Sequence, residues 1–186
     1  NQPAPAYDRA TPVEVGHVVF FVLDLNRTTA FYQDVLGFQV SDRYPGRGHF
    51  MRCAPSGGHH DMFLLQLPTP KAGLNHVAFT VRDLHEVVGG GMHMSRKGWA
   101  TDLGPGRHPI SSAMFWYFNN PAGALAEYYT DEDELTADWQ PRDFTPEVGE
   151  PFEVAMMSDD VQAVVHHDAT LGAVRLPYFG GDYSMV

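Results

Sequence analysis

The chain contains two copies of one short motif, and this internal duplication restricts its fold more than any other feature. Residues 16–25 read GHVVFFVLDL and residues 75–84 read NHVAFTVRDL, so six of ten aligned positions are identical. In each copy, an apolar run typical of a strand ends near an acidic residue suited to cap a helix. Two copies at a spacing of 59 residues predict a duplicated module rather than a solenoid, because a solenoid stacks many repeats.

Matching patterns follow the two copies. After the strand at 16–25, the first module is expected to have a helix at 26–36 and strands at 38–44, 48–53 and 62–67. After the strand at 75–84, the second module is expected to have a helix at 84–96 and strands at 99–103, 113–118 and 124–129. The first helix is expected to pack against the core through one apolar face, which contains Ala30, Phe31, Val35 and Leu36.

These patterns predict an α+β protein built from two paired βαβββ modules. Module one covers 15–68 and module two 74–130, within one domain at 15–130. Residues 1–14 are proline-rich and are expected to form a disordered or extended arm. Residues 131–186 begin with an acidic cluster and are expected to form an irregular C-terminal extension. Its aromatic residues suggest that it lies on the body or on a partner subunit: Trp139, Phe144, Phe152 and Tyr178.

The composition excludes several classes of function. A formal net charge of −11 without a basic patch argues against nucleic acid or an anionic membrane as a partner. Ten histidines are many for 186 residues, and histidine is the commonest metal ligand. The single cysteine, Cys53, rules out an intrachain disulfide and fits a reducing compartment. No leader and no long apolar run is indicated, so we expect a cytoplasmic protein.

The stretch from Gly106 to Tyr129 contains the most informative polar residue. Two aromatic-rich runs, 113–118 and 124–129, flank an Asn/Pro/Gly turn and predict a β-hairpin. Alternation along the second strand puts Glu127 on the same face as Leu125 and Tyr129. A carboxylate on a buried apolar face costs several kcal/mol unless a cation or hydrogen-bond donors meet it. Glu127 therefore needs a partner.

The duplication supplies candidates for that partner. His17 and His76 occupy equivalent positions near the start of each module's first strand. If the two halves of the sheet face a shared concavity, both imidazoles point into it, and Glu127 can reach the same space. Two histidines and one carboxylate form the facial triad of non-haem Fe(II) oxygenases. The alternatives are two structural histidines, and a Glu127 that pairs with an arginine.

The motifs also resemble a known family. The paired modules, the two openings and the run Phe31-Tyr32-x-x-Val35-Leu36-Gly37-Phe38 look like the vicinal oxygen chelate superfamily. Within it, the stretch from Gly106-Arg107-His108 to Glu127 resembles the signature of the type I extradiol ring-cleaving dioxygenases, with Trp116 as a departure from the usual aliphatic residue or Phe. The resemblance covers residues 15–130, and the chain is similar to the single-domain members.

The resemblance implies a mixed-sheet half-barrel around a central metal site. Its metal would be Fe(II), with Mn(II) as an alternative, and its ligands would be His17, His76 and Glu127. The implied reaction opens the aromatic ring of a catechol-type substrate, a small aromatic diol, with O2. We also expect a homo-oligomer.

The same resemblance implies the catalytic residues. His108 and Tyr117 match the pair that contacts the oxygen atoms of the catecholate. The family's acid–base histidine falls near His59 and His60, of which we expect His60 to act. The expected walls of the substrate pocket are Phe115, Trp116, Phe118 and Tyr129.

Two other functions fit parts of the pattern. A glyoxalase-like lyase or epimerase usually takes a second carboxylate ligand from the last strand of the first module, where this chain offers only Gln66. In a metal-free, resistance-type module that binds small molecules, His17, His76 and Glu127 need not all occur. The run His166-His167-Asp168 resembles a metal cluster, but it lies in the weakly patterned extension and we interpret it as surface.

Overall fold

The computed structural model describes residues 9–145 and the backbone of residues 164–166 and 173–175. The first module contains β1 (Glu14–Phe21), α1 (Leu25–Asp34), β2 (Gln39–Tyr44), β3 (Gly48–Arg52), β4 (Gly57–Gly58) and β5 (Met62–Leu65). The second contains β6 (Gly73–Thr80), α2 (Leu84–Arg96), β7 (Thr101–Arg107), β8 (Met114–Asn119) and β9 (Leu125–Thr130). The later strands are β10 (Glu134–Leu135), β11 (Arg142–Asp143), β12 (Val164–His166) and β13 (Ala173–Arg175).

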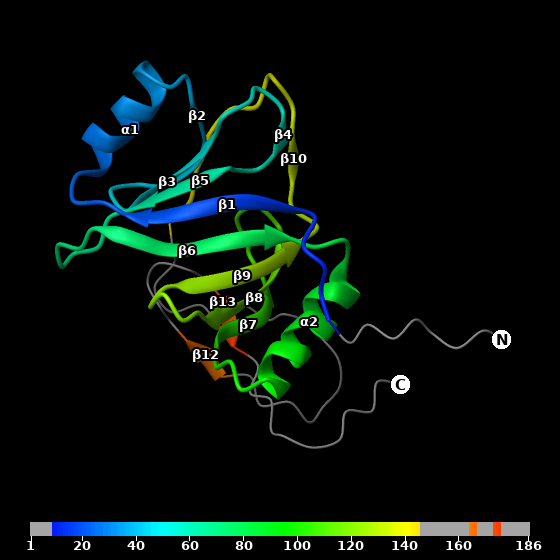
Figure 1. Ribbon diagram of the computed structural model, residues 1–186. Coiled ribbons are helices and arrows are strands. Elements are labelled where there is room, and N and C mark those ends of the chain that lie inside the picture. Colours follow the sequence, from blue (N-terminus) through cyan, green and yellow to red (C-terminus); the bar gives the residue numbers. More distant parts are fainter. Residues whose placement is uncertain (1–8, 146–163, 167–172, 176–186) are drawn as a thin grey trace.

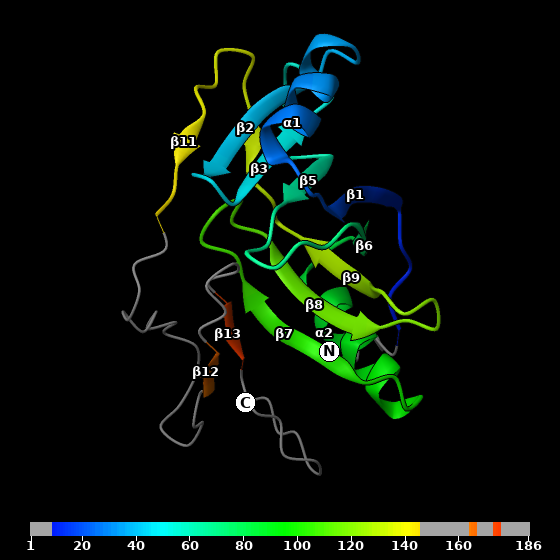
Figure 2. The ribbon, with the colours of Figure 1, turned by 90° about the vertical axis from the view of Figure 1, so that its left-hand side faces the viewer.

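One mixed sheet connects the two modules. Within the described residues its strand order is β11-β2-β3-β5-β1-β6-β9-β8-β7 (Figures 1 and 2). The two copies of the repeated motif, β1 and β6, pair antiparallel at the junction, with Val19 opposite His76. In each module the first strand pairs parallel with the last, β1 with β5 and β6 with β9. The predicted α+β fold, with a mixed sheet shared by two βαβββ modules, is confirmed.

The elements follow the sequence pattern closely, with one shifted strand. The acidic residues of the repeat cap both helices: Asp24 accepts from the amide of Arg27, and Asp83 from that of Glu86. Strand β7 begins later than expected and continues through Pro105 to Arg107. A proline is tolerated there because β7 is the edge strand of the sheet and need not donate on its open side.

The two faces of the sheet carry separate clusters. Along β1, Val19 and Phe21 point to one face, whereas Val18 and Phe20 point to the other. The first face holds aromatic clusters from both modules, and the second is covered by α1 and α2 (Figure 1). Met51 and Leu64, which lie beneath α1, are fully buried. Burial of such side chains contributes about 1.5–3 kcal/mol each.

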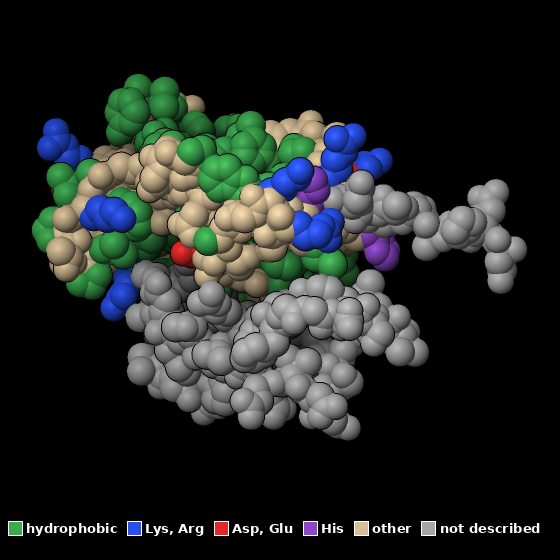
Figure 3. Space-filling model, turned by 60° about the horizontal axis from the view of Figure 1, so that its bottom comes forward, with side chains coloured by type: hydrophobic (Ala, Val, Ile, Leu, Met, Phe, Trp, Pro, Cys, Tyr) green, Lys and Arg blue, Asp and Glu red, His purple; other side chains and the backbone are tan. Residues whose placement is uncertain are grey.

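The expected inner face of α1 is wrong. The buried stripe of α1 consists of Leu25 and Thr29, and Thr29 Oγ1 lies 2.8 Å from His49 Nδ1. Phe31 and Val35 are instead 50% and 66% exposed. The helix packs through the stripe that begins at its first residue, because Asp24 fixes where the helix starts and therefore how it is rotated. Exposed hydrophobic side chains also occur elsewhere on the surface (Figure 3).

Residues 131–145, which we call the C-terminal strap, run back along the first module (Figure 2). Strand β10 pairs with β4, and β11 pairs in parallel with β2. Trp139 Nε1 donates to the carbonyl of Ser41 at 2.9 Å, and Phe144 packs against the cluster of the first face. The strap therefore lies on the body. Phe152, Tyr178, His167 and Asp168 lie outside the described residues, as do residues 1–8.

Before β1, Val13 donates its amide to the carbonyl of Thr80 at 2.9 Å. Ala10 packs against the cluster under α2. The described helices include none that is long and apolar enough to cross a membrane.

Candidate metal centre

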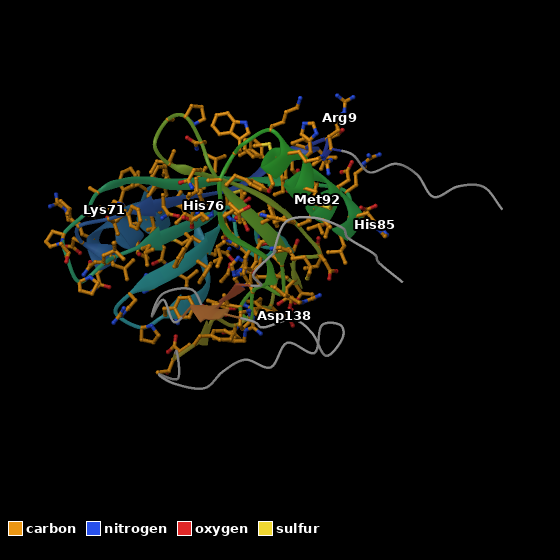
Figure 4. All side chains as sticks on the ribbon, turned by 90° about the horizontal axis from the view of Figure 1, so that it is seen from below. Arg9, Lys71, His76, His85, Met92 and Asp138 are labelled. Carbon is orange, nitrogen blue, oxygen red and sulfur yellow. The ribbon has the colours of Figure 1, made fainter. Side chains whose placement is uncertain are left out.

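Three side chains converge at the junction of the two modules. His17, His76 and Glu127 come from the neighbouring strands β1, β6 and β9, and alternation puts all three on the first face of the sheet. Glu127 Oε2 lies 3.0 Å from His17 Nε2 and 3.2 Å from His76 Nε2. The two Nε2 atoms are 3.3 Å apart. All three residues are buried, and His76 lies in the interior of the side-chain view, far from Lys71 and His85 at its edges (Figure 4).

His17 and His76 do not supply the positive charge that would balance the carboxylate of Glu127. His76 Nδ1 lies 2.5 Å from Asn75 Oδ1, so this nitrogen donates and Nε2 keeps its lone pair. Burial first, and then the nearby His60, lower the pKa of His17 to about 4, so His17 is neutral. Burial alone would raise the pKa of Glu127, but the adjacent nitrogens of His17, His108 and His76 hold it well below its usual value.

This donor set fits a divalent metal ion. Neither oxygen of Glu127 has a well-formed hydrogen bond within residues 9–145, although both are buried. A buried ionised carboxylate without such partners is costly unless a cation meets it. Imidazole and carboxylate ligands bind a first-row ion such as zinc at about 2.0–2.2 Å, so adjacent ligand atoms stand about 3 Å apart. The observed separations of 3.0, 3.2 and 3.3 Å match that spacing.

Sequence reasoning missed two features beside these ligands. Asn75 orients His76, and its position just before the histidine of the repeat could have suggested this role. The equivalent residue in module one is Gly16, above which the ring of Tyr129 lies so closely that any Cβ would collide with it. The ring centroids of Tyr129 and His17 are 4.9 Å apart. The residue before the histidine therefore differs between the two copies of the motif, because Asn75 orients His76 whereas Gly16 makes room for Tyr129.

His108 and Tyr117 lie on the second-module side of the centre. His108 Nε2 is 3.0 Å from the hydroxyl of Tyr117 and 3.7 Å from Glu127 Oε1. The imidazole stacks on Phe115 with centroids 4.0 Å apart, which fixes its plane. Burial and the charge of Glu127 raise the pKa of Tyr117 well above its usual value, so its hydroxyl keeps its proton. The pair can therefore donate hydrogen bonds toward the centre.

His60 lies on the first-module side of the centre, next to His17. Their ring centroids are 4.2 Å apart, and His60 is 6% exposed. Burial and the neighbouring His59 lower the pKa of His60 well below its usual value, so it is neutral. His59 turns away, with Nε2 at 2.8 Å from Asp42 Oδ2. Of the two adjacent histidines, His60 is thus the one beside the candidate ligands.

A second carboxylate, Glu132, was not expected at the site. Its Oε1 lies 3.0 Å from His60 Nδ1, and burial raises its pKa to about 7. Ligand atoms of His17, His60 and Glu132 also lie within 4.8 Å of one another. The acidic run 131–134 resembles a solvated surface segment in sequence. The chain turns at Asp131, with φ of 59°, and returns Glu132 to the site.

A cavity of about 270 Å³ adjoins His60 and is lined by residues of both modules and the strap, among them Gly16, Arg52, Ser56, Tyr129 and Glu132. Of the expected pocket walls, Phe115 and Tyr129 lie on the face that carries the metal ligands. Trp116 and Phe118 belong to the cluster under α2 on the opposite face, so their assignment as pocket walls is wrong. Neighbours along β8 alternate faces, and the prediction took residues from both.

In a glyoxalase-like lyase, the last strand of the first module would supply a fourth metal ligand, but β5 offers no such side chain. Gln66, just after β5, accepts a hydrogen bond from the amide of Leu25 at 2.7 Å and is therefore engaged with the start of α1. Within β5, Phe63 and Leu65 occupy the first face. Cys53 is a free, exposed thiol.

The chain was compared with known proteins. It is 34% identical over 141 residues to metapyrocatechase 2 of Cupriavidus necator, covering 75% of this chain and 43% of that protein. It is 30% identical over 122 residues to biphenyl-2,3-diol 1,2-dioxygenase of Paraburkholderia xenovorans strain LB400, covering 61% of this chain and 40% of that protein. The chain thus spans less than half the length of these curated relatives.

Solved structures with the same fold include the Mn(II)-bound glyoxalase of Novosphingobium aromaticivorans, with a TM-score of 0.68 and 28% identity over 82% of this chain and 50% of that one. A halotolerant catechol dioxygenase matches with a TM-score of 0.64 and 26% identity over 72% of this chain and 46% of that one. A family model matches residues 14–128. The chain belongs to the Glyoxalase/Bleomycin resistance protein/Dioxygenase superfamily.

Proposed function

We propose that the protein is an Fe(II)-dependent extradiol dioxygenase that opens the ring of a catechol-type substrate with O2. The observation that carries this proposal is the convergence of His17, His76 and Glu127 within 3.0–3.3 Å of one another. The relatives named metapyrocatechase 2 and biphenyl-2,3-diol 1,2-dioxygenase support the choice of reaction. Mn(II) is the alternative metal. The homo-oligomer stays a prediction.

Two imidazoles and one carboxylate would hold the iron and leave coordination positions free. When bound, the iron would supply a Lewis-acidic centre at which the diol oxygens and O2 meet, which favours the ionised diol and makes their reaction effectively intramolecular. The neutral donors His17 and His76 and the anionic Glu127 would leave the centre with a net positive charge. That charge favours a bound catecholate anion.

The surrounding residues would handle protons and charge. His60 is neutral and buried, which suits a general base that accepts a proton from the second hydroxyl and later returns it to the product. His108 and Tyr117 would donate hydrogen bonds to oxygen atoms on which negative charge develops. Phe115 and Tyr129 offer aromatic surface on the same face. In the net reaction, both oxygen atoms of O2 enter the product, and a ring carbon–carbon bond beside the two hydroxyls breaks.

The test is oxygen uptake by protein loaded anaerobically with Fe(II), followed with catechol and with alkyl- and aryl-substituted catechols. One O2 should be consumed per ring opened, and ¹⁸O₂ should place two labelled atoms in the product. The variant His49→Asn removes an imidazole that contacts Thr29, away from the candidate centre, and should retain activity. An absence of uptake by iron-loaded and Mn(II)-loaded protein across the panel would refute the proposal. Isomerisation of a hemithioacetal without O2 would favour the lyase instead.

A further inference from the structure

Four side chains form a continuous chain of polar contacts from the strap to His60. Arg142 Nη2 donates to Asp42 Oδ2 at 2.6 Å, and the amide of Arg142 donates to Asp42 Oδ1 at 2.7 Å. Asp42 Oδ2 is also 2.8 Å from His59 Nε2. The opposite nitrogen of that ring, His59 Nδ1, lies 3.1 Å from His60 Nδ1. Asp42 and His59 are fully buried, so no solvent competes for these contacts.

We propose that His59 is a positioning residue that fixes the tautomer of His60, so that His60 carries its proton on Nδ1 and presents Nε2 as the base. The proposal rests on the proposed function, because it concerns the acid–base histidine of that reaction. His59 would then do more than pack in the core. Asp42 on β2 and Arg142 in the strap would help to orient the acid–base histidine.

As an ionised carboxylate, Asp42 can only accept hydrogen bonds. It receives donors from the backbone and side chain of Arg142, and it lies on β2 opposite β11 of the strap. Burial would raise the pKa of Asp42, but hydrogen bonds from His59 and Arg142 lower it, so the carboxylate stays ionised. A nitrogen 2.8 Å from an ionised carboxylate must carry a proton, and His59 Nε2 is therefore the donor.

The next contact follows from the chemistry of a neutral imidazole, which has one donor nitrogen and one acceptor nitrogen. With its single proton on Nε2, a neutral His59 would offer a lone pair at Nδ1. The 3.1 Å contact then requires His60 Nδ1 to donate. Glu132 Oε1 also lies 3.0 Å from this nitrogen, although the two atoms are not aligned as a hydrogen bond. His60 Nε2 is left without a proton.

The position of Nε2 fits the task of a base. Within residues 9–145, no hydrogen-bond partner of His60 Nε2 is found. His60 lines the cavity of about 270 Å³ and lies beside His17. The strap supplies Arg142, which binds Asp42, so the segment after the second module contributes to the contacts that orient the base.

The first test reads the tautomers directly and needs no turnover. Nitrogen-15 NMR of the metal-free and the Zn(II)-loaded full chain distinguishes protonated from unprotonated ring nitrogens, with His60→Gln and His59→Asn assigning the signals. We expect a protonated Nδ1 and an unprotonated Nε2 on His60, and the reverse on His59. A His60 ring protonated on Nε2, or on both nitrogens, at neutral pH overturns the proposal.

The second test compares two replacements of His59 in the Fe(II)-loaded enzyme. Asparagine places Oδ1 where His59 Nδ1 stands and still accepts from His60, whereas leucine accepts nothing. We expect His59→Leu to lower kcat on the order of tenfold to a hundredfold, which is the loss typical when the hydrogen-bond partner that orients a metal-bound histidine is removed. His59→Asn should recover most of that loss, with KM and iron content unchanged in both. The control His49→Asn, at the imidazole bound to Thr29, should match wild type.

Equal losses in His59→Leu and His59→Asn would overturn the proposal, since a purely structural histidine would give that result. If His59→Leu does not fold, the tautomers of the wild-type protein and of His59→Asn decide. A wild-type enzyme without dioxygenase activity would sink the proposed function, and the NMR result would still accept or reject the relay.

Discussion

Exchanging Glu127 for glutamine tests which of two carboxylates, Glu127 or Glu132, holds the metal. The described residues contain two candidate groups, His17-His76-Glu127 and His17-His60-Glu132. Glutamine keeps the size of glutamate and removes its charge, so Glu127→Gln and Glu132→Gln form a matched pair. Oε2 of Glu127 faces both Nε2 atoms at 3.0 and 3.2 Å, whereas Glu132 faces the nitrogen of His60 that we assign as a hydrogen-bond donor.

The expected magnitude follows from linkage. At a free metal concentration of one hundred times Kd, binding stabilises the wild-type fold by about 2.7 kcal/mol. Loss of an outer-shell partner weakens metal binding by about 10–100-fold, so loss of a direct ligand should reach at least the upper value. At the same metal concentration, Glu127→Gln would then gain only about 0.4 kcal/mol. For a chain of this size, the metal-induced rise in Tm should shrink from about 5–11 °C to about 1–2 °C.

Anaerobic calorimetry with and without Fe(II), together with elemental analysis, measures both quantities. Glu132→Gln should keep a stoichiometric metal and most of the wild-type rise in Tm. The reasoning is refuted if Glu127→Gln retains the metal while Glu132→Gln loses it, because the ion would then sit with His60.

Three further outcomes are expected. His60→Ala should keep its iron and lose at least about a hundredfold in kcat, as measured by oxygen uptake. If His60→Ala stays active and His59→Ala loses activity, His59 and not His60 is the acid–base residue. In urea denaturation, Arg142→Gln should lower the free energy of unfolding by about 1–3 kcal/mol, because Asp42 is left buried with fewer hydrogen-bond donors. The control Arg43→Gln removes an exposed ion pair between the same two strands and should cost less than about 1 kcal/mol. Equal costs for the two variants would contradict this expectation. In metal-free protein, the free energy of unfolding should fall as the pH drops from 6.5 to about 4, because only the unfolded state readily binds a proton at His17. The variant His17→Gln should flatten this pH dependence. A wild-type free energy of unfolding that does not change over this range would contradict the burial of a neutral imidazole at His17.

Much of the fold and the heart of the site could be predicted because they depend on local, periodic features. The duplicated motif placed His17 and His76 at equivalent positions, and the pairing of β1 with β6 makes those strands neighbours. Strand alternation put Glu127 on an apolar face, where it lies opposite Tyr117 in the register of the hairpin. A sequence repeat and the alternation of side chains along a strand can be recognised in the sequence without knowledge of any long-range contact.

The parts that were missed depend on long-range contacts. Asp42 and Arg142 are one hundred residues apart and meet only because β11 pairs with β2. Glu132 belongs to an acidic run that looks solvated, and only the turn at Asp131 directs it inward. The inner face of α1 was wrong because the cap at Asp24 fixes the start of the helix, and Leu25 and Thr29, not Phe31 and Val35, then face the sheet.

The most direct measurement is anomalous X-ray scattering at the iron edge from crystals grown with Fe(II) under anaerobic conditions. Our account predicts one strong peak within bonding distance of His17 Nε2, His76 Nε2 and a Glu127 oxygen. A peak between His60 and Glu132, or metal-loaded crystals with no peak between the two modules, would contradict it.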